Sequence, residues 1–466
     1  MIATSGELAK IVGAQLRGPL DLPVERLVTD SRQAGPGDLF VPVVGLQHDG
    51  HDFVAGAWQR GAQVIFAAPG ALAARGLEPP AGSAVLEVLD PRAAYGQVGA
   101  WWRARFPALV MVGITGSLGK TSTKELAAQI LSRRGPIIAN QDSFNNEVGV
   151  PATLLRLGPE HWAAIQEMGM RGPGQIAELC ELVRPALGLI TNIGHSHLGV
   201  LGSRQAIAEA KGELLDCLGR DGTALLNADD PHSRSLAPRH SGRIVWFGQS
   251  AESVRLAEVR GSDVRLQGLS GSRFVLTIAG GPPVEVRLPL PGPHMVANAL
   301  AAAAIGHALG FTATDIGDAL SQPARLAMRG EVLTLANGAR LINDAYNAAP
   351  ESVAAALGIL AAEPTTGRRI AVLGGMAELG ATSTVEHLRL GAAAGQVVDL
   401  LVCVGPAAAE IAEGAAGGRA KVIALPDVPA VAEWLARELR DGDLALLKAS
   451  RVYELESVLT GLEVRA

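Results

Sequence analysis

Apolar runs and amphipathic segments alternate along residues 108–227, and this alternation predicts strands and helices that follow one another. The expected strands are Val110–Thr115, Ala163–Met168, Leu187–Ile193 and Ala224–Asn227, and the expected helices are 122–134, 174–182 and 204–218. Such an order is typical of a mainly parallel sheet, which binds ligands at the carboxyl ends of its strands.

Different patterns flank this region. Residues 1–107 hold short strands and helices, and Pro107 ends them. Short alternating segments with glycine turns over 244–288 predict an antiparallel patch, and two helices follow at 295–309 and 315–320. From residue 325 the strand and helix alternation restarts, with strands expected at 340–343, 370–373, 400–404, 422–425 and 444–448. We therefore predict an α/β protein of three domains: a small N-terminal α/β domain (1–107), a central parallel-sheet domain (108–322) and a C-terminal Rossmann-like domain (323–466).

Composition supports a globular protein of several domains. A chain of 466 residues is too long for one hydrophobic core, and 48% hydrophobic with 18% charged residues is far from a disordered composition. No apolar run approaches the roughly 20 residues that span a bilayer, and the N-terminus lacks the features of a secretory signal. We expect a cytoplasmic, monomeric protein without membrane insertion. A net charge of −6 argues against nucleic-acid binding and favours small anionic partners.

The three cysteines are expected to be structural. Cys180, Cys217 and Cys403 lie far apart without the C-x-x-C spacing of a metal or redox site. They are interpreted as small core residues, so neither a disulfide framework nor a zinc site is predicted.

A glycine-rich segment between the first strand and helix of the central region predicts a phosphate-binding loop. Its residues are Thr115, Gly116, Ser117, Leu118, Gly119, Lys120 and Thr121. Glycines let backbone N–H groups surround phosphate oxygens, Lys120 supplies a cation, and the Thr121 hydroxyl suits a magnesium shell. The strict pattern has glycine where Ile114 stands, so this is a shortened form; the alternative is an ordinary glycine-rich turn. The interpretation makes the central domain a nucleotide-binding P-loop ATPase domain.

Polar residues follow the other strands of this sheet. Glu167 ends the second strand, where a carboxylate would complete a magnesium shell or simply be solvated. His195 and His197 follow the next strand, at an edge where ligands bind. Lys211 lies on the helix after them, and it is one of only six lysines among 40 basic residues. Taken singly it would be a solvated helix lysine.

These segments resemble signatures of the Mur ligase family, the ATP-dependent amide ligases of peptidoglycan synthesis. The resemblance rests on T-G-S-L-G-K-T, on the T-N-I-x-x-x-H run ending at His197, and on A-K-G-E around Lys211. It implies ATP and Mg²⁺ as cofactors, with Lys120, Asn146, His197 and Lys211 as catalytic residues. It also implies that Thr121, Glu167, His197 and Lys211 bind metal, Lys211 as a carbamate, which is an anionic oxygen ligand that an arginine cannot form.

Within the family, the chain is most similar to the branch that adds D-alanyl-D-alanine to UDP-N-acetylmuramoyl-tripeptide. The similar motifs are 145–151 (N-N-E-V-G-V-P), 344–350 (D-A-Y-N-A-A-P), 372–380 (V-L-G-G-M-A-E-L-G) and 448–451 (K-A-S-R). The D-N-P-R motif of diaminopimelate-adding relatives is missing from the sequence. Four positions depart from the branch pattern: Gly375 stands where aspartate is usual, Ala349 and Met295 where asparagine is common, and Ala449 where glycine is common.

The resemblance assigns further contacts. Asn298, Arg329, Asp344 and Tyr346 would bind ATP, although Asn298 could be a helix-surface amide and Asp344 a helix cap. Candidates for the sugar nucleotide and the acceptor are Ser31, Arg32, His51, Asp52, Asn145, Lys448, Ser450 and Arg451. Asn145 or Asn146 could also contact the γ-phosphate. The first four candidates could equally be surface turn residues.

Two other functions fit the same loop. Folylpolyglutamate synthetases and cyanophycin-type ligases share similar central loops, but the segments 344–350 and 376–380 argue against them. A nucleotide-gated binding protein that hydrolyses ATP slowly would require Glu167, His197 and Lys211 to be coincidental.

Overall fold

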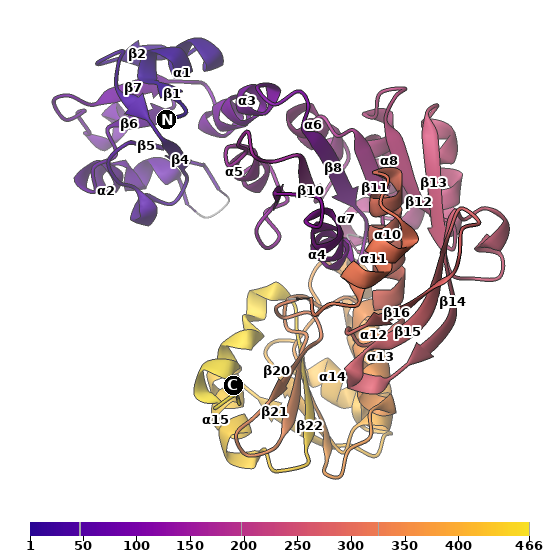
Figure 1. The fold of residues 1–466 in the computed structure, drawn as a ribbon. Coiled ribbons are helices and arrows are strands. Elements are labelled where there is room, and N and C mark those ends of the chain that lie inside the picture. The colour runs from indigo at the N-terminus through magenta and orange to yellow at the C-terminus, as the bar shows by residue number, and fades with distance from the viewer. Residues whose placement is uncertain (46–47, 197, 325, 466) are drawn as a thin grey trace. The chain divides into compact units, whose positions relative to one another are not determined.

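The structure is a computed structural model that describes residues 1–45, 48–196, 198–324 and 326–465 (Figure 1). The chain forms two compact units of α/β type. One unit contains residues 1–113, 135–170 and 174–186, and the other contains 114–134, 171–173 and 187–466. The three-domain division at residues 107 and 322 stays a prediction.

The first unit begins with a five-stranded sheet of order β2-β7-β6-β5-β4. Its strands are β2 (Gln15–Arg17), β4 (Arg26–Val28), β5 (Asp38–Phe40), β6 (Val64–Ala67) and β7 (Ala84–Glu87), all parallel except β2. A small antiparallel pair, β1 (Ala3–Thr4) and β3 (Pro23–Val24), adjoins α1 (Ser5–Val12). The helices α2 (Val54–Gln59) and α3 (Pro91–Ala104) follow, and α3 begins where the Asp90 side chain accepts from Arg92 N and Ala93 N before a proline at the first turn.

A nine-stranded sheet has the order β16-β15-β14-β13-β12-β11-β8-β10-β9. Its strands are β8 (Val110–Thr115), β9 (Ile137–Ala139), β10 (Ala163–Glu167), β11 (Leu187–Ile190), β12 (Thr223–Asn227), β13 (Arg243–Gly248), β14 (Val259–Leu266), β15 (Ser272–Ile278) and β16 (Val284–Leu288). The four strands expected from the sequence are confirmed within a few residues. The antiparallel patch is confirmed only for β14 to β16, because β13 pairs parallel with β12 and also parallel with β14.

Helices accompany this sheet, and the alanine-rich one packs tightly. They are α4 (Lys120–Leu131), α5 (Gly149–Leu154), α6 (Gln175–Val183), α7 (Leu198–Leu201), α8 (Arg204–Asp216), α9 (Pro231–Ser235), α10 (Pro293–Ala308) and α11 (Ala313–Leu320). The helix α10 packs against α4, and a Cβ placed on Gly306 would lie 3.0 Å from Ile130 Cγ2. Small side chains therefore allow close helix packing here.

A six-stranded sheet of order β17-β18-β22-β19-β20-β21 forms the C-terminal part. The strands are β17 (Glu331–Thr334), β18 (Arg340–Asn343), β19 (Arg369–Leu373), β20 (Leu400–Val404), β21 (Lys421–Leu425) and β22 (Leu444–Lys448), parallel except for β17. The helices are α12 (Pro350–Ala362), α13 (Ser383–Val397), α14 (Ala408–Ala415) and α15 (Val428–Glu438). The five strands predicted from the sequence are all present, whereas β17 was not predicted.

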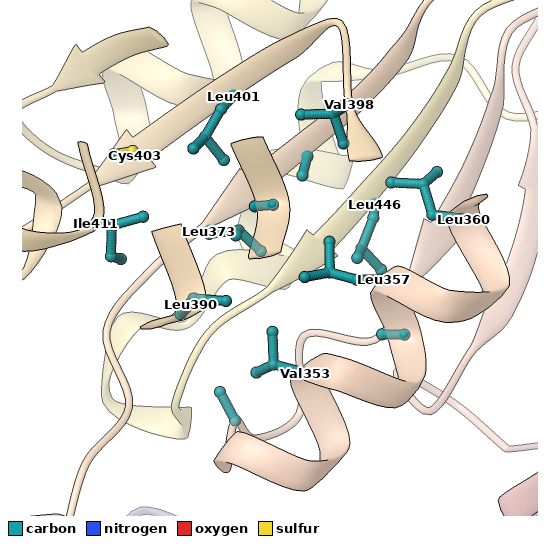
Figure 2. Packing of buried hydrophobic residues seen from close by; sticks show 14 of the residues in the cluster. Val353, Leu357, Leu360, Leu373, Leu390, Val398, Leu401, Cys403, Ile411 and Leu446 are labelled. Carbon is teal, nitrogen blue, oxygen red and sulfur yellow. The ribbon is translucent and has the colours of Figure 1, made fainter. Parts of the chain in front are cut away.

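Helices on the faces of this sheet bury its apolar strands. Figure 2 shows Val353, Leu357 and Leu360 of α12 directed towards Leu373 and Leu446 of the sheet. A second core forms around Trp434 of α15. Burial of each aliphatic side chain contributes about 1.5–3 kcal/mol to the free energy of unfolding. The packed faces therefore hold the strands in place, including the strand ends where the polar loops begin.

The cysteine prediction is correct for two residues and wrong for the third. Cys180 and Cys403 are buried free thiols, and burial raises the pKa of Cys403 to about 12. Cys217 is exposed, because it caps the C-terminal end of α8 instead of facing the core. Among the described residues, no helix is long and apolar enough to cross a membrane.

Candidate functional site

The predicted phosphate-binding loop joins the end of β8 to the start of α4. Gly116 has φ 146° and Gly119, the residue before α4, has φ 79°, a region that favours glycine. A Cβ on Gly116 would lie 1.9 Å from Thr191 Oγ1, so a side chain has no room there. The loop therefore presents main chain and a helix N-terminus, which together form an anion-binding arrangement.

Residues after β11 hold this loop in place. Thr191 Oγ1 donates to Leu118 O at 2.6 Å, and Asn192 both donates to Leu118 O (3.1 Å) and accepts from Leu118 N (3.0 Å). Gly194 N donates to Ser117 Oγ at 2.8 Å. The sequence analysis did not predict that Thr191 and Asn192 support the loop. The T-N-I motif that contains them was the feature of the sequence that could have indicated this role.

Two lysines lie close to the loop. The Lys120 ammonium donates to Gly116 O at 2.8 Å, so this side chain folds back onto the loop. Lys211, on α8, is almost completely buried. Burial first, and the positive charge of Lys120 second, lower the pKa of Lys211 well below the usual lysine range. A buried amine in the neutral form is a nucleophile, which an ammonium is not.

Two contacts join the phosphate loop and its helix to residues much later in the chain. One involves Thr121 and the other involves the buried Asn298. Arg329 Nη2 donates to Thr121 Oγ1 at 2.9 Å, and its guanidinium stacks over the Tyr346 ring at 4.1 Å from the centroid. A Cβ on Gly119 would lie 2.1 Å from Asn298 Oδ1, so Asn298 is buried against the loop and is not a helix-surface amide. The sulfur of Met295 accepts from Asn298 Nδ2 at 3.6 Å.

The ends of β18 and β22 carry a buried ion pair. The Lys448 ammonium, 2% exposed, donates to Asp344 Oδ2 at 2.5 Å and to Asn347 O at 3.0 Å. Lys448 therefore holds the D-A-Y-N loop through these two bonds, and Asp344 does not cap α12, whose preceding residue is Ala349.

Ser450 and Arg451 follow at the same edge. The buried Ser450 hydroxyl accepts from Ala377 N at 2.7 Å, which ties it to the loop after β19. Arg451 pairs with Glu456 and lies 6.0 Å from the Tyr346 ring centroid.

Glu167 and Asn145 form a pair in the first unit. Glu167 is 1% exposed at the end of β10, and Asn145 Nδ2 donates to its Oε1 at 2.8 Å. Asn140 Oδ1 accepts from Glu167 N at 2.8 Å. Asn146 is exposed, and its side chain accepts from Gly149 N at 2.9 Å, at the start of α5. Burial of Glu167 excludes the simple solvated carboxylate that was the alternative.

The N-terminal candidates lie on two short turns. Ser31 and Arg32 belong to a 3₁₀ turn, where the exposed Arg32 pairs with Asp30 at 2.8 Å. His51 is buried, with Nδ1 2.6 Å from Asp49 and Nε2 accepting from Ala68 N at 3.0 Å. Asp52 accepts from Arg75 at 2.7 Å. Both nitrogens of His51 are thus used inside the fold, which gives it a supporting role.

Two histidines were predicted after β11. His195 contacts Glu351, the second residue of α12, through both its ring and its backbone N–H. His197 lies outside the described residues. Within the described ranges, no group of three His, Cys, Asp or Glu side chains is arranged to hold a metal ion.

Comparison with protein families decides what kind of chain carries this loop. Residues 114–306 match the Mur ligase middle domain, residues 328–451 the Mur ligase glutamate ligase domain, and residues 23–100 the Mur ligase family catalytic domain. The chain belongs to the Mur ligase family. The three matches cover most of this Mur ligase, so the family prediction is confirmed.

Two relatives of this Mur ligase carry the same name. It is 37% identical to the UDP-N-acetylmuramoyl-tripeptide–D-alanyl-D-alanine ligase of Synechocystis, over 95% of this chain and 92% of that protein. It is also 37% identical to the Escherichia coli protein of the same name, over 86% of each chain.

Solved structures agree with this likeness. MurF from Acinetobacter baumannii has a TM-score of 0.86 and 31% identity, and the match covers 98% of both chains. MurF from Thermotoga maritima, solved in complex with ADP, has a TM-score of 0.79 and 28% identity over 95% of this chain and 97% of that one. The Escherichia coli FolC structure, at 18% identity and a TM-score of 0.59, shares the fold alone.

Proposed function

We propose that this Mur ligase is an ATP-dependent peptide ligase that joins D-alanyl-D-alanine to UDP-N-acetylmuramoyl-tripeptide. One observation carries the proposal: a glycine-rich loop before a helix N-terminus lies in a chain that is 37% identical, over 95% of its length, to a ligase of that name. The γ-phosphoryl group of ATP would pass to the terminal carboxylate of the tripeptide. The dipeptide amine would then attack the acyl phosphate, which forms the amide and releases ADP and phosphate. The reaction belongs to cytoplasmic precursor synthesis for the cell wall.

The loop residues would bind and orient the triphosphate. Main-chain N–H groups at the α4 N-terminus and the Lys120 ammonium would face the phosphates, and Asn298, which lies against Gly119, would contact the nucleotide. Positioning and charge neutralisation are the main contributions a protein makes to phosphoryl transfer. Arg329, Asp344 and Tyr346 are proposed to reach the nucleotide from the C-terminal part.

Two of the predicted metal ligands are of a chemical type that magnesium binds. Glu167 is a buried carboxylate and Thr121 a hydroxyl, both hard oxygen ligands, and nucleotide-bound magnesium takes other ligands from phosphate and water. A buried carboxylate also needs a cation or strong donors nearby. When bound, the ion would neutralise charge on the transferring phosphoryl group. Asn145 orients the Glu167 carboxylate through its amide.

Lys211 is proposed to act as a carbamate. Its burial disfavours an ammonium, and in the described part of the chain it has no acidic partner within ion-pair distance. A neutral amine adds to carbon dioxide and loses one proton, which creates an anionic oxygen donor at the same place. That donor, with His197, would hold a second metal ion.

Further substrate contacts are proposed for the N-terminal turns and for the carboxyl edge of the C-terminal sheet. Ser31, Arg32 and Asp52 would face the uridine diphosphate group, with His51 supporting their turn. Asn145 and Asn146 would lie near the γ-phosphate. Lys448 and Ser450 would shape the acceptor site through the loops they hold, and Arg451 would contact the acceptor carboxylate.

The proposal is tested by a substrate panel with one matched pair of lysine variants. Phosphate release and product mass are measured with ATP, magnesium, UDP-N-acetylmuramoyl-tripeptide and D-alanyl-D-alanine. They are then measured with dihydropteroate as the carboxylate substrate and glutamate as the amine substrate. Lys120→Ala should abolish turnover, whereas Lys421→Ala, at an exposed strand start, should retain it. Product formation only with a folate or amino-acid polymer substrate would assign another ligase of the family. ATP hydrolysis indifferent to all of them would assign a nucleotide-gated binding protein.

A further inference from the structure

Tyr453 lies against three glycines at the carboxyl edge of the C-terminal sheet. It ends the 3₁₀ turn after β22, while Gly374 and Gly375 follow β19 and Gly405 follows β20. A Cβ on Gly405 would lie 2.4 Å from Tyr453 Cε1, and one on Gly374 would lie 3.1 Å from Tyr453 Cδ1. The tyrosine ring therefore fills the space that side chains at these positions would need.

The space beside Tyr453, and not the backbone conformation, requires a glycine at residue 375. Its φ is outside the left-handed region, so an L-residue could adopt its conformation. A Cβ at residue 375 would lie 2.6 Å from the Tyr453 hydroxyl oxygen and 3.0 Å from Ala407 Cβ. The aspartate expected at this position from the family pattern could not fit beside Tyr453. The hydroxyl thus lies where a carboxylate side chain would begin.

Ala449 belongs to the same local change. A Cβ on Gly374 would lie 2.7 Å from Ala449 Cβ, so residues 374 and 449 also exclude each other's larger side chains. Two of the departures from the family pattern, Gly375 and Ala449, therefore meet around one tyrosine ring. Their common location indicates one rearranged site instead of independent losses.

The Tyr453 hydroxyl is the polar group of this site that remains open to a ligand. His387 Nε2 accepts from Met376 N at 2.8 Å, and its other ring nitrogen donates to Ser383 O at 2.8 Å, so both nitrogens are occupied. The Ser450 hydroxyl accepts from Ala377 N. Within the described chain the Tyr453 hydroxyl makes no hydrogen bond, and the residue is only half-buried. It lies at the strand edge where parallel α/β sheets bind ligands.

We propose that Tyr453 is a specificity-determining residue for the dipeptide acceptor, whose polar backbone its hydroxyl contacts from the place of the missing carboxylate. The proposal rests on the proposed ligase function. A tyrosine hydroxyl donates and accepts without a net charge, whereas a carboxylate only accepts and attracts cations. The contact therefore recognises a polar peptide group and does not require an ammonium.

Steady-state kinetics of Tyr453→Phe tests this role. The variant keeps the ring between the glycines and removes only the hydroxyl. One neutral hydrogen bond corresponds to about three- to tenfold in affinity, so KM for D-alanyl-D-alanine should rise by roughly that factor. KM for ATP and for UDP-N-acetylmuramoyl-tripeptide should stay unchanged. Val452→Ala, at a 79% exposed position on the same turn, should leave all three constants unchanged.

A second variant reaches the hydroxyl from the other side. Gly375→Ala would push the hydroxyl away from its position, so it should raise the dipeptide KM in the same direction. Combined with Tyr453→Phe it should add little, because the hydroxyl is already absent. Melting temperatures of all variants separate misfolding from a changed contact.

The outcomes distinguish this inference from the function on which it rests. If the unmodified enzyme forms the dipeptide product and Tyr453→Phe raises only the acceptor KM, Tyr453 contacts the acceptor. If product forms and the acceptor KM of stable Tyr453→Phe is unchanged, the inference is overturned while the ligase function stands. If the unmodified enzyme forms no product with the dipeptide, both fail.

Discussion

Arg329 donates a hydrogen bond to the hydroxyl of Thr121, 208 positions earlier in the chain, at 2.9 Å. Thr121 lies on the first turn of the helix after the phosphate loop, and the Arg329 guanidinium is stacked on Tyr346. A residue at the start of the C-terminal family match is therefore in direct contact with the helix that follows the phosphate loop in the middle-domain match. A guanidinium in this position can attract the negative charge of a bound triphosphate.

Arg329→Ala should raise KM for ATP about tenfold or more, because hydrogen bonds that involve a charged group are worth about 1.5–3 kcal/mol. The dipeptide KM should change less. Arg419→Ala provides the matched control, because the Arg419 side chain is 55% exposed and its guanidinium lies 3.6 Å from Asp399. Initial rates over a range of ATP concentrations give the result. An unchanged KM for ATP in Arg329→Ala would show that the Thr121 contact is unrelated to nucleotide binding.

Lys211 should make stability depend on pH. Its pKa is lowered in the folded state, while in the unfolded chain it returns to about 10.4. Between these two values the unfolded state binds more protons, so the free energy of unfolding contributed by Lys211 rises with pH, by up to about 1.4 kcal/mol per pH unit. Lys211→Met should remove this slope. Urea unfolding of both proteins at pH 7, 8 and 9 in carbonate-free buffer measures it.

Lys421→Met is the control for that comparison, since Lys421 is exposed at the start of β21. Its unfolding should follow the pH dependence of the unmodified protein. Parallel curves for the Lys211→Met and unmodified proteins would mean that the buried amine stays charged in the folded state. The carbamate proposal has its own test: short-chain carboxylic acids should restore turnover to Lys211→Ala.

Gly119→Ala should damage both folding and ATP turnover. The residue has φ 79°, and its new Cβ would lie 2.1 Å from Asn298 Oδ1. The left-handed conformation alone costs a non-glycine residue about 1–2 kcal/mol, and the clash adds to this. Gly76→Ala separates the two effects, because Gly76 has φ 62° and nothing within 4 Å of the new Cβ. Melting temperature and ATP turnover should fall further for Gly119→Ala; equal losses would exclude a role for Asn298.

His51 and Arg32 should respond differently to substitution. His51→Ala removes an acceptor for Ala68 N and a partner of Asp49, so it should cost about 1–3 kcal/mol of stability. Its effect on KM for the sugar nucleotide should be small at a temperature where the variant is folded. Arg32→Ala, at a side chain 83% exposed, should leave stability unchanged and raise that KM. Thermal melts and kinetics on both variants check this; the reverse pattern would make His51 the contact residue.

The sequence predicted the architecture well where strands are buried on both faces. Continuous apolar runs such as Leu400–Val404 have no other stable placement, and their helices show the expected period. It failed for β13, because a strand that ends a parallel run and one that starts an antiparallel run look alike. It also failed for Cys217, since a helix C-terminus can expose a residue that the helical period alone places in the core.

Site residues were predictable where chemistry forces a motif and not where partners come from distant segments. Gly116, Gly119 and Lys120 follow from the loop alone. The support of that loop by Thr191 and Asn192 depends on strand order, which a local pattern does not contain. The fit of Tyr453 against Gly375 likewise arises only after β19 and β22 are neighbours.

The most direct test of the account is the dependence of phosphate release on both substrates together. The complete mixture contains ATP, magnesium, UDP-N-acetylmuramoyl-tripeptide and D-alanyl-D-alanine, and parallel reactions omit one of these at a time. The mass of the nucleotide product is measured by mass spectrometry. We predict phosphate release only in the complete mixture, with a product heavier by the dipeptide minus one water. Phosphate release that is indifferent to the tripeptide nucleotide and the dipeptide, without such a product, would contradict the account.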